Sequence, residues 1–388
     1  MQRNLHLTKV SQNYLFLEIS RRVEQFLAHH PKASLVNLGV GNTTEPLSGA
    51  ITAACSDAAL KLATKEGYSG YGPEQGNQTL RRKIAREIYS DAVHPDEIYI
   101  SDGAKCDIGR LQTLFGSAIS IAVQDPTYPV YVDGSLLQGV KEVIFMPCHA
   151  ENQFFPCLDK LTRTDLIYFC SPNNPTGAAT TKEQLEELVL FAKKNRSIIL
   201  FDAAYASFIQ DPLLPRSIFE IEGAREVAIE INSFSKLAGF TGVRLGWTVV
   251  PEALLFDDGS SVKADWHRLI STLFNGASNL AQAGGMVALE EKKHLVATTE
   301  FYLENASLLK RAFEALGVAV FGGVHAPYLW VQFKGEKSWD VFERFLERYH
   351  LVTTPGSGFG REGEGFLRLT AFGSRERVQE AVNRLSHL

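Results

Sequence analysis

Between residues 99 and 250, short apolar runs alternate with longer amphipathic runs. The helical pattern is clearest over 182–193, where apolar residues recur at i, i+3, i+4 and i+7. Glutamates near its start and lysines at its end suit the helix dipole. This alternation is typical of a mostly parallel sheet covered on both faces by helices. The predicted strands are 119–123, 166–170, 198–202, 227–231 and 245–250.

After about residue 280 the pattern changes to longer helical stretches with few strands, which predicts a second, smaller α+β domain. The first 45 residues contain one helix and too few other elements to fold alone, so we expect them to pack on that domain. The predicted fold is therefore α/β, with a three-layer α/β/α large domain and a small α+β domain. The large domain spans 46–280, and the small domain combines 1–45 with 281–388.

Composition and charge narrow the class of protein. The chain has 388 residues, 45% hydrophobic and 21% charged, as in globular proteins, and a formal net charge of −5. This balance gives no basic field for nucleic acid. Apolar runs stop after about five residues, far short of the ~20 that cross a membrane, and we identify no secretory signal. We therefore expect a cytoplasmic protein without nucleic-acid or membrane partners.

Several common kinds of site are not expected. Five cysteines without a CxxC pair fit neither a disulfide framework nor a zinc site, and the ten histidines show no metal-binding spacing. A GxGxxG pattern occurs at 358–363, but a dinucleotide fingerprint must follow a strand and open a helix. Here the pattern follows Pro355 and leads into a strand-like run at 366–369. We therefore expect neither a metal ion nor a nicotinamide or flavin cofactor.

The segment 233–247 carries the strongest chemical signal. It follows a predicted strand and places Lys236 among serines and glycines, with Arg244 eight residues further on. Burial and a nearby guanidinium would both disfavour the ammonium form of this lysine and free its amine as a nucleophile. Ser233 and Arg244 would be donors to a bulky anion.

Three further segments point to the same region. Asp202 ends an apolar strand, where an unpaired carboxylate is costly and needs a cationic partner. The turn 171–177 follows another strand and can present the Asn174 amide at the sheet edge. Residues 102–105 precede a predicted helix over 107–115, whose N-terminal N–H groups could cradle a phosphate.

Together these segments resemble the class I and II aminotransferases, the aspartate aminotransferase-like, fold type I enzymes that depend on pyridoxal 5'-phosphate. The Ser-x-Ser-Lys, Asn-Pro-x-Gly and Asp-x-x-Tyr elements and the eight-residue Lys-to-Arg spacing occur in the order of that family. The resemblance covers essentially the whole chain. It implies amino transfer between amino acids and 2-oxo acids by a homodimer with shared active sites.

The resemblance also implies roles for individual residues. Lys236 would hold the cofactor as a Schiff base and move the proton, while Asp202 would keep the pyridine nitrogen protonated. Tyr205 and Asn174 would hydrogen-bond the phenolate oxygen, and Tyr128 would stack on the ring. The residues expected around the phosphate are Ala104, Lys105, Ser233, Ser235, Arg244 and Tyr71 of the partner subunit.

For the substrate, Arg368 would clamp the α-carboxylate, assisted by Asn174 and the Gly41 backbone. Finer features, such as those at 41–46, 70–76 and 101–110, resemble the LL-diaminopimelate aminotransferases. That resemblance implies transfer of an amino group between LL-diaminopimelate and 2-oxoglutarate. In the biosynthetic direction, the amino group would pass from glutamate to tetrahydrodipicolinate, in lysine and peptidoglycan precursor synthesis. The residues expected at the rest of the substrate are Tyr14, Lys105 and Tyr128 of the same chain, with Tyr71, Glu74 and Asn275 of the partner subunit.

Other functions stay open on the sequence. An aminotransferase of this fold could act on an aromatic amino acid, alanine or an N-acyl-diaminopimelate, and a lyase or synthase could use the same cofactor. A regulatory effector-binding module would need an appended DNA-binding domain, for which no ~60 residues remain.

In the segment 41–46, Asn42 replaces the aspartate that more usually follows the glycine. Glutamate would have to share the pocket, which implies a flexible or water-mediated subsite.

Overall fold

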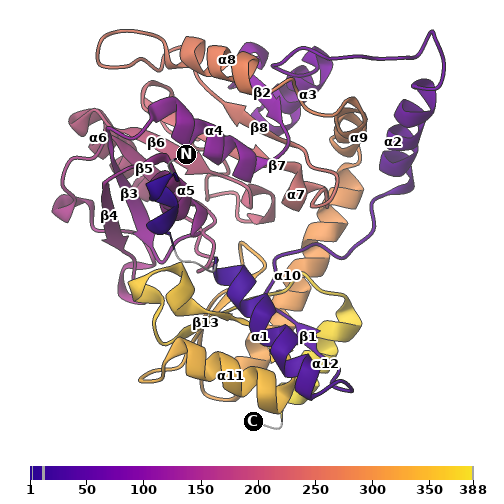
Figure 1. Ribbon diagram of the computed structural model, residues 1–388, viewed down its shortest axis with the longest axis vertical. Coiled ribbons are helices and arrows are strands. Elements are labelled where there is room, and N and C mark those ends of the chain that lie inside the picture. The colour runs from indigo at the N-terminus through magenta and orange to yellow at the C-terminus, as the bar shows by residue number, and fades with distance from the viewer. Residues whose placement is uncertain (2, 11–13, 387–388) are drawn as a thin grey trace.

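The computed structural model describes residues 1, 3–10 and 14–386, and its main feature is a seven-stranded sheet (Figure 1). Strand β8 is antiparallel to both neighbours, and the remaining pairings are parallel. The predicted mostly parallel sheet is therefore confirmed. In spatial order the strands are β2 (Ile98–Ser101), β8 (Gly246–Val249), β7 (Ala228–Ser233), β6 (Ile198–Asp202), β5 (Leu166–Cys170), β3 (Ser120–Asp125) and β4 (Glu142–Pro147).

The pattern of the sequence does not predict β2 and β4, the two edge strands of this sheet. Strand β2 has only four residues. Strand β4 mixes exposed and buried positions without regular alternation. The exposed positions of β4 weaken its hydrophobic signal, whereas β2 is fully buried and gives only a short run.

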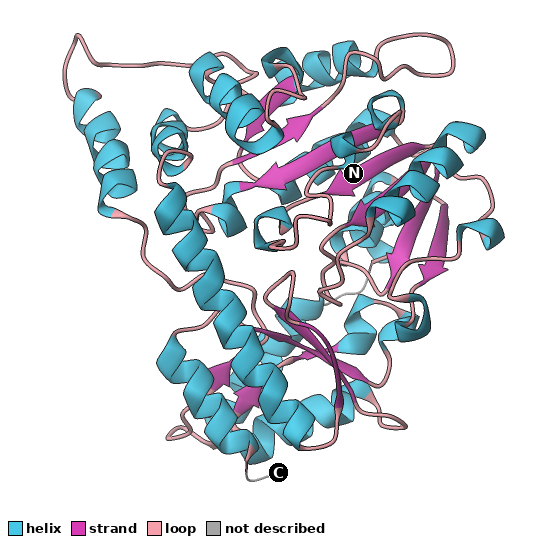
Figure 2. Ribbon diagram, turned by 180° about the vertical axis from the view of Figure 1, so that it is seen from behind, coloured by secondary structure: helices cyan, strands magenta, loops and turns pink. Residues whose placement is uncertain are grey.

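Helices cover the large sheet on both sides (Figure 2). On one face, α6 (Lys182–Asn195) packs its buried leucines on apolar side chains of β5 and β6. Its N-terminus is capped by Thr181, whose hydroxyl accepts a hydrogen bond from Gln184 N. The helices on the other face are α4 (Ala104–Phe115), α5 (Val130–Gln138) and α8 (Val262–Leu273). Those beside β2 and β8 are α3 (Gln78–Tyr89), α9 (Asn279–Ala288) and the short α7 (Phe234–Leu237), with α2 (Gly49–Lys61) against α9.

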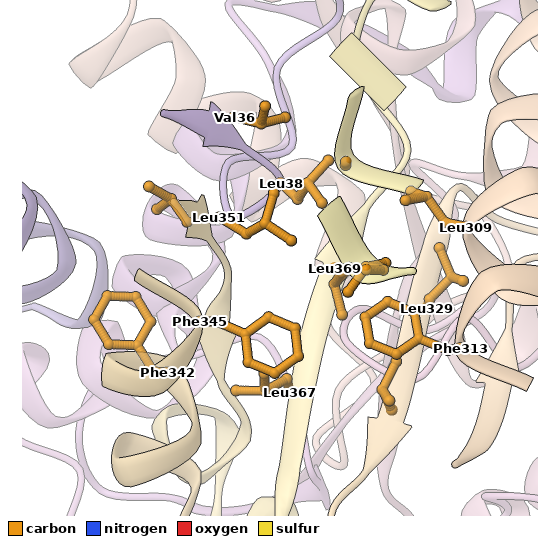
Figure 3. Close-up of a cluster of buried hydrophobic side chains, with 14 of the residues drawn as sticks. Val36, Leu38, Leu309, Phe313, Leu329, Phe342, Phe345, Leu351, Leu367 and Leu369 are labelled. Atoms are coloured by element: carbon orange, nitrogen blue, oxygen red, sulfur yellow. The ribbon is translucent and has the colours of Figure 1, made fainter. Parts of the chain in front are cut away.

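A second, antiparallel sheet lies near the C-terminus, in the order β12 (Thr354–Pro355), β13 (Phe366–Thr370), β10 (Tyr328–Gln332) and β9 (Ala319–Gly322). Strand β1 (Val36–Asn37) pairs in parallel with β11 (Leu351–Val352) beside it. Figure 3 shows the buried side chains of this region. Its helices are α1 (Leu15–His29), α10 (Lys292–Ala315), α11 (Ser338–Tyr349) and α12 (Arg375–Leu385).

The N-terminal helix packs on this smaller sheet, as the sequence predicts. Ile19 and Phe26 of α1 belong to the same buried cluster as Phe345 of α11 and Leu367 of β13. Figure 1 shows α10 extending from the large sheet to the small one. No helix in the described residues has the length and apolar character that a membrane crossing requires.

The GxGxxG pattern forms two short 3-10 turns, Gly356–Phe359 and Arg361–Gly363, that lead into β13. At Gly360 the backbone has φ +139°, and a β-carbon there would overlap Asp125 Oδ1 at the end of β3. Glu362 N donates to the same carboxylate at 3.2 Å. The glycine therefore allows this loop to touch the edge of the large sheet, and it does not open a helix.

We predict that Gly360→Ala destabilises the protein by about 2–4 kcal/mol, because the new methyl group must displace the Asp125 carboxylate. Urea denaturation measures the change. The control is Gly259→Ala, a position with φ +82° and no atom near a built β-carbon. Left-handed strain alone should cost about 1 kcal/mol there. Equal losses in the two variants would contradict the proposed contact.

Candidate active site

A cavity of about 320 Å³ opens at the carboxyl ends of the parallel strands, between the two sheets. Asp202 is the last residue of β6 and Ser233 the last of β7, while Asn174 and Tyr128 follow β5 and β3. The predicted site residues that line the cavity are Gly41, Ala104, Lys105, Tyr128, Asn174, Asp202, Tyr205, Ser233, Ser235, Lys236, Arg244 and Arg368.

Lys236 projects into this cavity from the short helix α7. Its Nζ donates a hydrogen bond to the Gly41 carbonyl and lies 4.7 Å from the centroid of the Phe372 ring. Burial, followed by the positive charges of Arg368 and Arg244, lowers the pKa of this lysine to about 7. A substantial fraction of the amine is therefore neutral at neutral pH, as a nucleophile or proton acceptor requires.

Asp202 is a buried carboxylate without a cationic partner among the described residues. Tyr131 Oη donates to its Oδ2 at 2.7 Å, and Ala204 N donates to its Oδ1 at 3.0 Å. Burial raises its pKa, and these two hydrogen bonds oppose the rise. A cationic nitrogen of a ligand would pair with this carboxylate and favour its ionised form.

A cluster of donors surrounds the N-terminus of α4. Gly103 is the N-cap residue and has no side chain, so the first turn of α4 has no side-chain cap, and Ala104 and Lys105 of this turn line the cavity. The Arg244 guanidinium lies against Gly103, and its Nη1 is 3.4 Å from Ser235 Oγ. Free helix N–H groups, a hydroxyl and a guanidinium together suit a phosphate group.

Arg368 of β13 is 1% exposed, and no carboxylate pairs with it in the described part of the chain. Its Nη1 donates to Asn174 Oδ1 at 2.8 Å, and its Nη2 donates to the Gly39 carbonyl. Its Nε is buried and has no hydrogen-bond partner. A buried guanidinium with an unused donor suits the carboxylate of a ligand.

Tyr14 lies beside the cavity, just before α1. Its ring centroid is 4.8 Å from Lys105 Nζ, a residue that lines the cavity. Burial raises the pKa of Tyr14 well above its usual value, and its hydroxyl has no partner in the described residues. The hydroxyl is therefore available to a ligand.

Tyr71, Glu74 and Asn275 do not line this cavity. They lie on a separate surface, where Tyr71 is 89% exposed. The segments that carry them touch, because Asn279 Nδ2 donates to the Gly70 carbonyl at 3.2 Å. The three residues therefore belong to one exposed surface of the chain, apart from its own cavity.

The cavity also contains residues that the sequence does not identify. Tyr131 supports Asp202 from the first turn of α5, three residues after Tyr128, which precedes this helix. Phe16 and Tyr328 come from α1 and β10, far away in the chain, and no local signal relates them to the site.

The family model for aminotransferase class I and II matches residues 33–385. The chain belongs to this aminotransferase family. It is 54% identical to the LL-diaminopimelate aminotransferase of Protochlamydia amoebophila, over 100% of this chain and 97% of that protein. It is 52% identical to the chloroplastic LL-diaminopimelate aminotransferase of Arabidopsis thaliana, over 100% of this chain and 87% of that one.

A solved structure of another LL-diaminopimelate aminotransferase also matches the whole chain. The L,L-diaminopimelate aminotransferase from Chlamydomonas reinhardtii superposes with a TM-score of 0.96 at 54% identity, covering 100% of this chain and 98% of that chain. The predicted fold and the predicted aminotransferase family are therefore confirmed.

The lowered pKa of Lys236 predicts how the stability of the cofactor-free aminotransferase changes with pH. An unfolded lysine titrates near 10.5, so between pH 7 and 10.5 the unfolded chain binds a proton that the folded chain lacks. Lys236 therefore destabilises the fold most at pH 7 and below, and this effect disappears as the pH rises towards 10.5.

We expect Lys236→Met to be more stable than the wild-type protein by roughly 1–3 kcal/mol at pH 7, with the difference shrinking by pH 10. Chemical denaturation of the cofactor-free proteins at both pH values measures it. Lys334→Met, which changes an exposed lysine, is the control and should show a small difference at both values. A difference for Lys236→Met that does not depend on pH would contradict the lowered pKa.

Proposed function

We propose that this aminotransferase exchanges an amino group between LL-diaminopimelate and 2-oxoglutarate, with pyridoxal 5'-phosphate as cofactor. In the biosynthetic direction it would transfer the amino group of glutamate to tetrahydrodipicolinate. The observation that carries the proposal is one cavity with a lysine of lowered pKa, an unpaired buried carboxylate and a phosphate-sized donor cluster. The choice of substrate is supported by relatives named LL-diaminopimelate aminotransferase at 52–54% identity.

The unused groups of the cavity fit pyridoxal phosphate. The N-terminus of α4, with Arg244 and Ser235, would hold the phosphate group, and Asp202 would hold the protonated pyridine nitrogen. Ala104, Lys105, Ser233 and Tyr71 of the partner subunit would complete the phosphate site. The bound cofactor supplies an electron sink that stabilises negative charge on the substrate Cα atom.

The remaining contacts orient the ring and the substrate. Tyr128 would stack on the cofactor, while Tyr205 and Asn174 would hydrogen-bond its phenolate oxygen. Arg368 would bind the α-carboxylate through its two-pronged guanidinium. The hydrogen bond from Arg368 to Asn174 would fix both side chains before the substrate arrives.

Lys236 would attach the cofactor covalently and afterwards act as the base. With a pKa of about 7, its amine can accept a proton from the substrate Cα at neutral pH and return one at the next step. Its hydrogen bond to the Gly41 carbonyl holds Nζ in the cavity that Arg368 also lines.

The distal end of diaminopimelate carries an ammonium and a carboxylate, which need partners of their own. We assign Glu74 and Asn275 of a neighbouring subunit to this end, together with Tyr14 of the same chain. Their exposure on one surface supports a homodimer in which that surface meets the partner's cavity. In this scheme, residues 46–280 form the cofactor-binding domain, and 1–45 with 281–388 form the small domain.

The purified protein is expected to be yellow with bound cofactor and to form glutamate from LL-diaminopimelate and 2-oxoglutarate. Comparison with meso-diaminopimelate and N-succinyl-diaminopimelate defines the substrate. No turnover of the LL isomer would refute the assignment, and turnover of the succinylated compound would favour another aminotransferase. Lys236→Ala should lose activity by at least ~1000-fold, while Lys334→Ala should keep it.

Glu74→Gln should reduce kcat/KM for LL-diaminopimelate by about 10- to 100-fold, the loss expected when a charged partner is removed, and should spare glutamate. Glu66→Gln changes another exposed carboxylate of the same region and is the matched control.

Mixing the Glu74→Gln variant with the Lys236→Ala variant tests whether two subunits share each active site. Hybrid dimers would contain one site with both defects and one with neither, so activity should return. If no activity returns, Glu74 does not act across subunits.

A further inference from the structure

Two tyrosine hydroxyl groups meet in the cavity, one from each side. Tyr205 follows β6 of the large sheet, and Tyr328 begins β10 of the small sheet. Their Oη atoms are 2.7 Å apart, and their buried rings pack edge to face with centroids 5.1 Å apart. In the described part of the chain neither hydroxyl has another hydrogen-bond partner.

The direction of this hydrogen bond decides what Tyr205 can offer a ligand. Each hydroxyl has one hydrogen, and the bond between them uses only one of the two. If Tyr328 donates, the hydrogen of Tyr205 is free to point into the cavity. If Tyr205 donates, it can only accept a hydrogen bond from a ligand.

The surroundings of the two tyrosines are not equivalent. The Arg368 guanidinium carbon lies 4.7 Å from the centroid of the Tyr328 ring. Burial raises the pKa of both hydroxyls, but Arg368 is the strongest opposing influence on Tyr328 and only a minor one on Tyr205. The more acidic hydroxyl is the better donor, which favours donation from Tyr328 to Tyr205.

The backbone at Gly41 also depends on this hydroxyl. A β-carbon at position 41 would overlap Tyr328 Oη, so only glycine leaves the hydroxyl beside Tyr205. The carbonyl of the same residue accepts the hydrogen bond from Lys236 Nζ. The Tyr328 ring thus lies against Arg368, and its hydroxyl lies beside Tyr205 and the backbone of Gly41.

We propose that Tyr328 is a positioning residue that donates its hydroxyl hydrogen to Tyr205 and so leaves Tyr205 as the donor that faces the bound cofactor. The proposal rests on the proposed function, which gives Tyr205 the phenolate oxygen of the cofactor as its acceptor. Tyr328 thereby connects the arginine that binds carboxylate with the hydroxyl that polarises the cofactor. It acts through Tyr205 and not on the reacting atoms.

The visible absorbance of the holoenzyme, titrated with pH, tests the direction of the bond. A hydrogen bond donated to an ionised oxygen favours the ionised form, so it lowers the pH midpoint at which the chromophore loses its proton. Tyr205→Phe should raise the midpoint by about one unit. Tyr328→Phe should raise the midpoint by roughly 0.3 unit, about a twofold change. The reason is that Tyr205 is a stronger donor while it accepts a hydrogen bond from Tyr328, and the substitution removes that hydrogen bond.

A lower midpoint in Tyr328→Phe would overturn the proposal, because it would mean that Tyr205 donates to Tyr328 in the wild-type enzyme. An unchanged midpoint would overturn it as well. In a Tyr205→Phe background, Tyr328→Phe should cause no further shift, and a further shift would show that Tyr328 does not act through Tyr205.

Tyr99→Phe controls for loss of a buried tyrosine hydroxyl elsewhere, because Tyr99 packs on Trp266 outside the cavity, and its midpoint should match the wild type. The titration needs bound cofactor but no particular substrate. A coloured enzyme that fails to act on LL-diaminopimelate therefore leaves this test valid. A wild-type protein without cofactor absorbance would refute both the proposed cofactor and the role of Tyr328.

Discussion

The structure depends on charges that one cavity leaves unpaired. Lys236, Arg244 and Arg368 bring positive charge to the same space, and Asp202 brings a buried carboxylate that pairs with none of them. Arg368 and Asp202 are buried, and a buried charge without a partner costs several kcal/mol, whereas Arg244 stays exposed. The lowered pKa of Lys236 and the raised pKa of Asp202 express this cost. A ligand that supplies anionic groups and a cationic nitrogen would offset this cost.

The surrounding fold holds these charges in place. Parallel strands end at the same edge of the large sheet, so Asp202 and Ser233 reach the cavity from adjacent strands without long loops. Arg368 comes from the middle of a small antiparallel sheet and is fixed by hydrogen bonds to Asn174 and the Gly39 carbonyl. Rigid strands on both sides therefore set the distance between the amine and the guanidinium, which is what substrate positioning needs.

The sequence predicts the parts of this site that have a local signal. Asp202 ends one buried strand, and Lys236 follows the next strand among small residues. The topology of a parallel sheet therefore predicts that the two residues lie close together. Phe16 and Tyr328 have no such signal, because they reach the cavity through packing between distant segments. The edge strand β4 is missed for a related reason, since its exposed positions weaken the apolar pattern.

The same separation in sequence explains why both halves of the chain are needed for one reaction centre. The large sheet supplies the amine, the carboxylate and the donors for a phosphate, while the small sheet supplies the guanidinium and the Tyr328 ring beneath it. Tyr205 and Tyr328 form a direct hydrogen bond between the two sides. Only the Tyr328 ring and this hydrogen bond therefore lie between Arg368 and the Tyr205 hydroxyl. In the proposed scheme, binding of a carboxylate at Arg368 would be coupled to the Tyr205 hydroxyl through these neighbouring side chains.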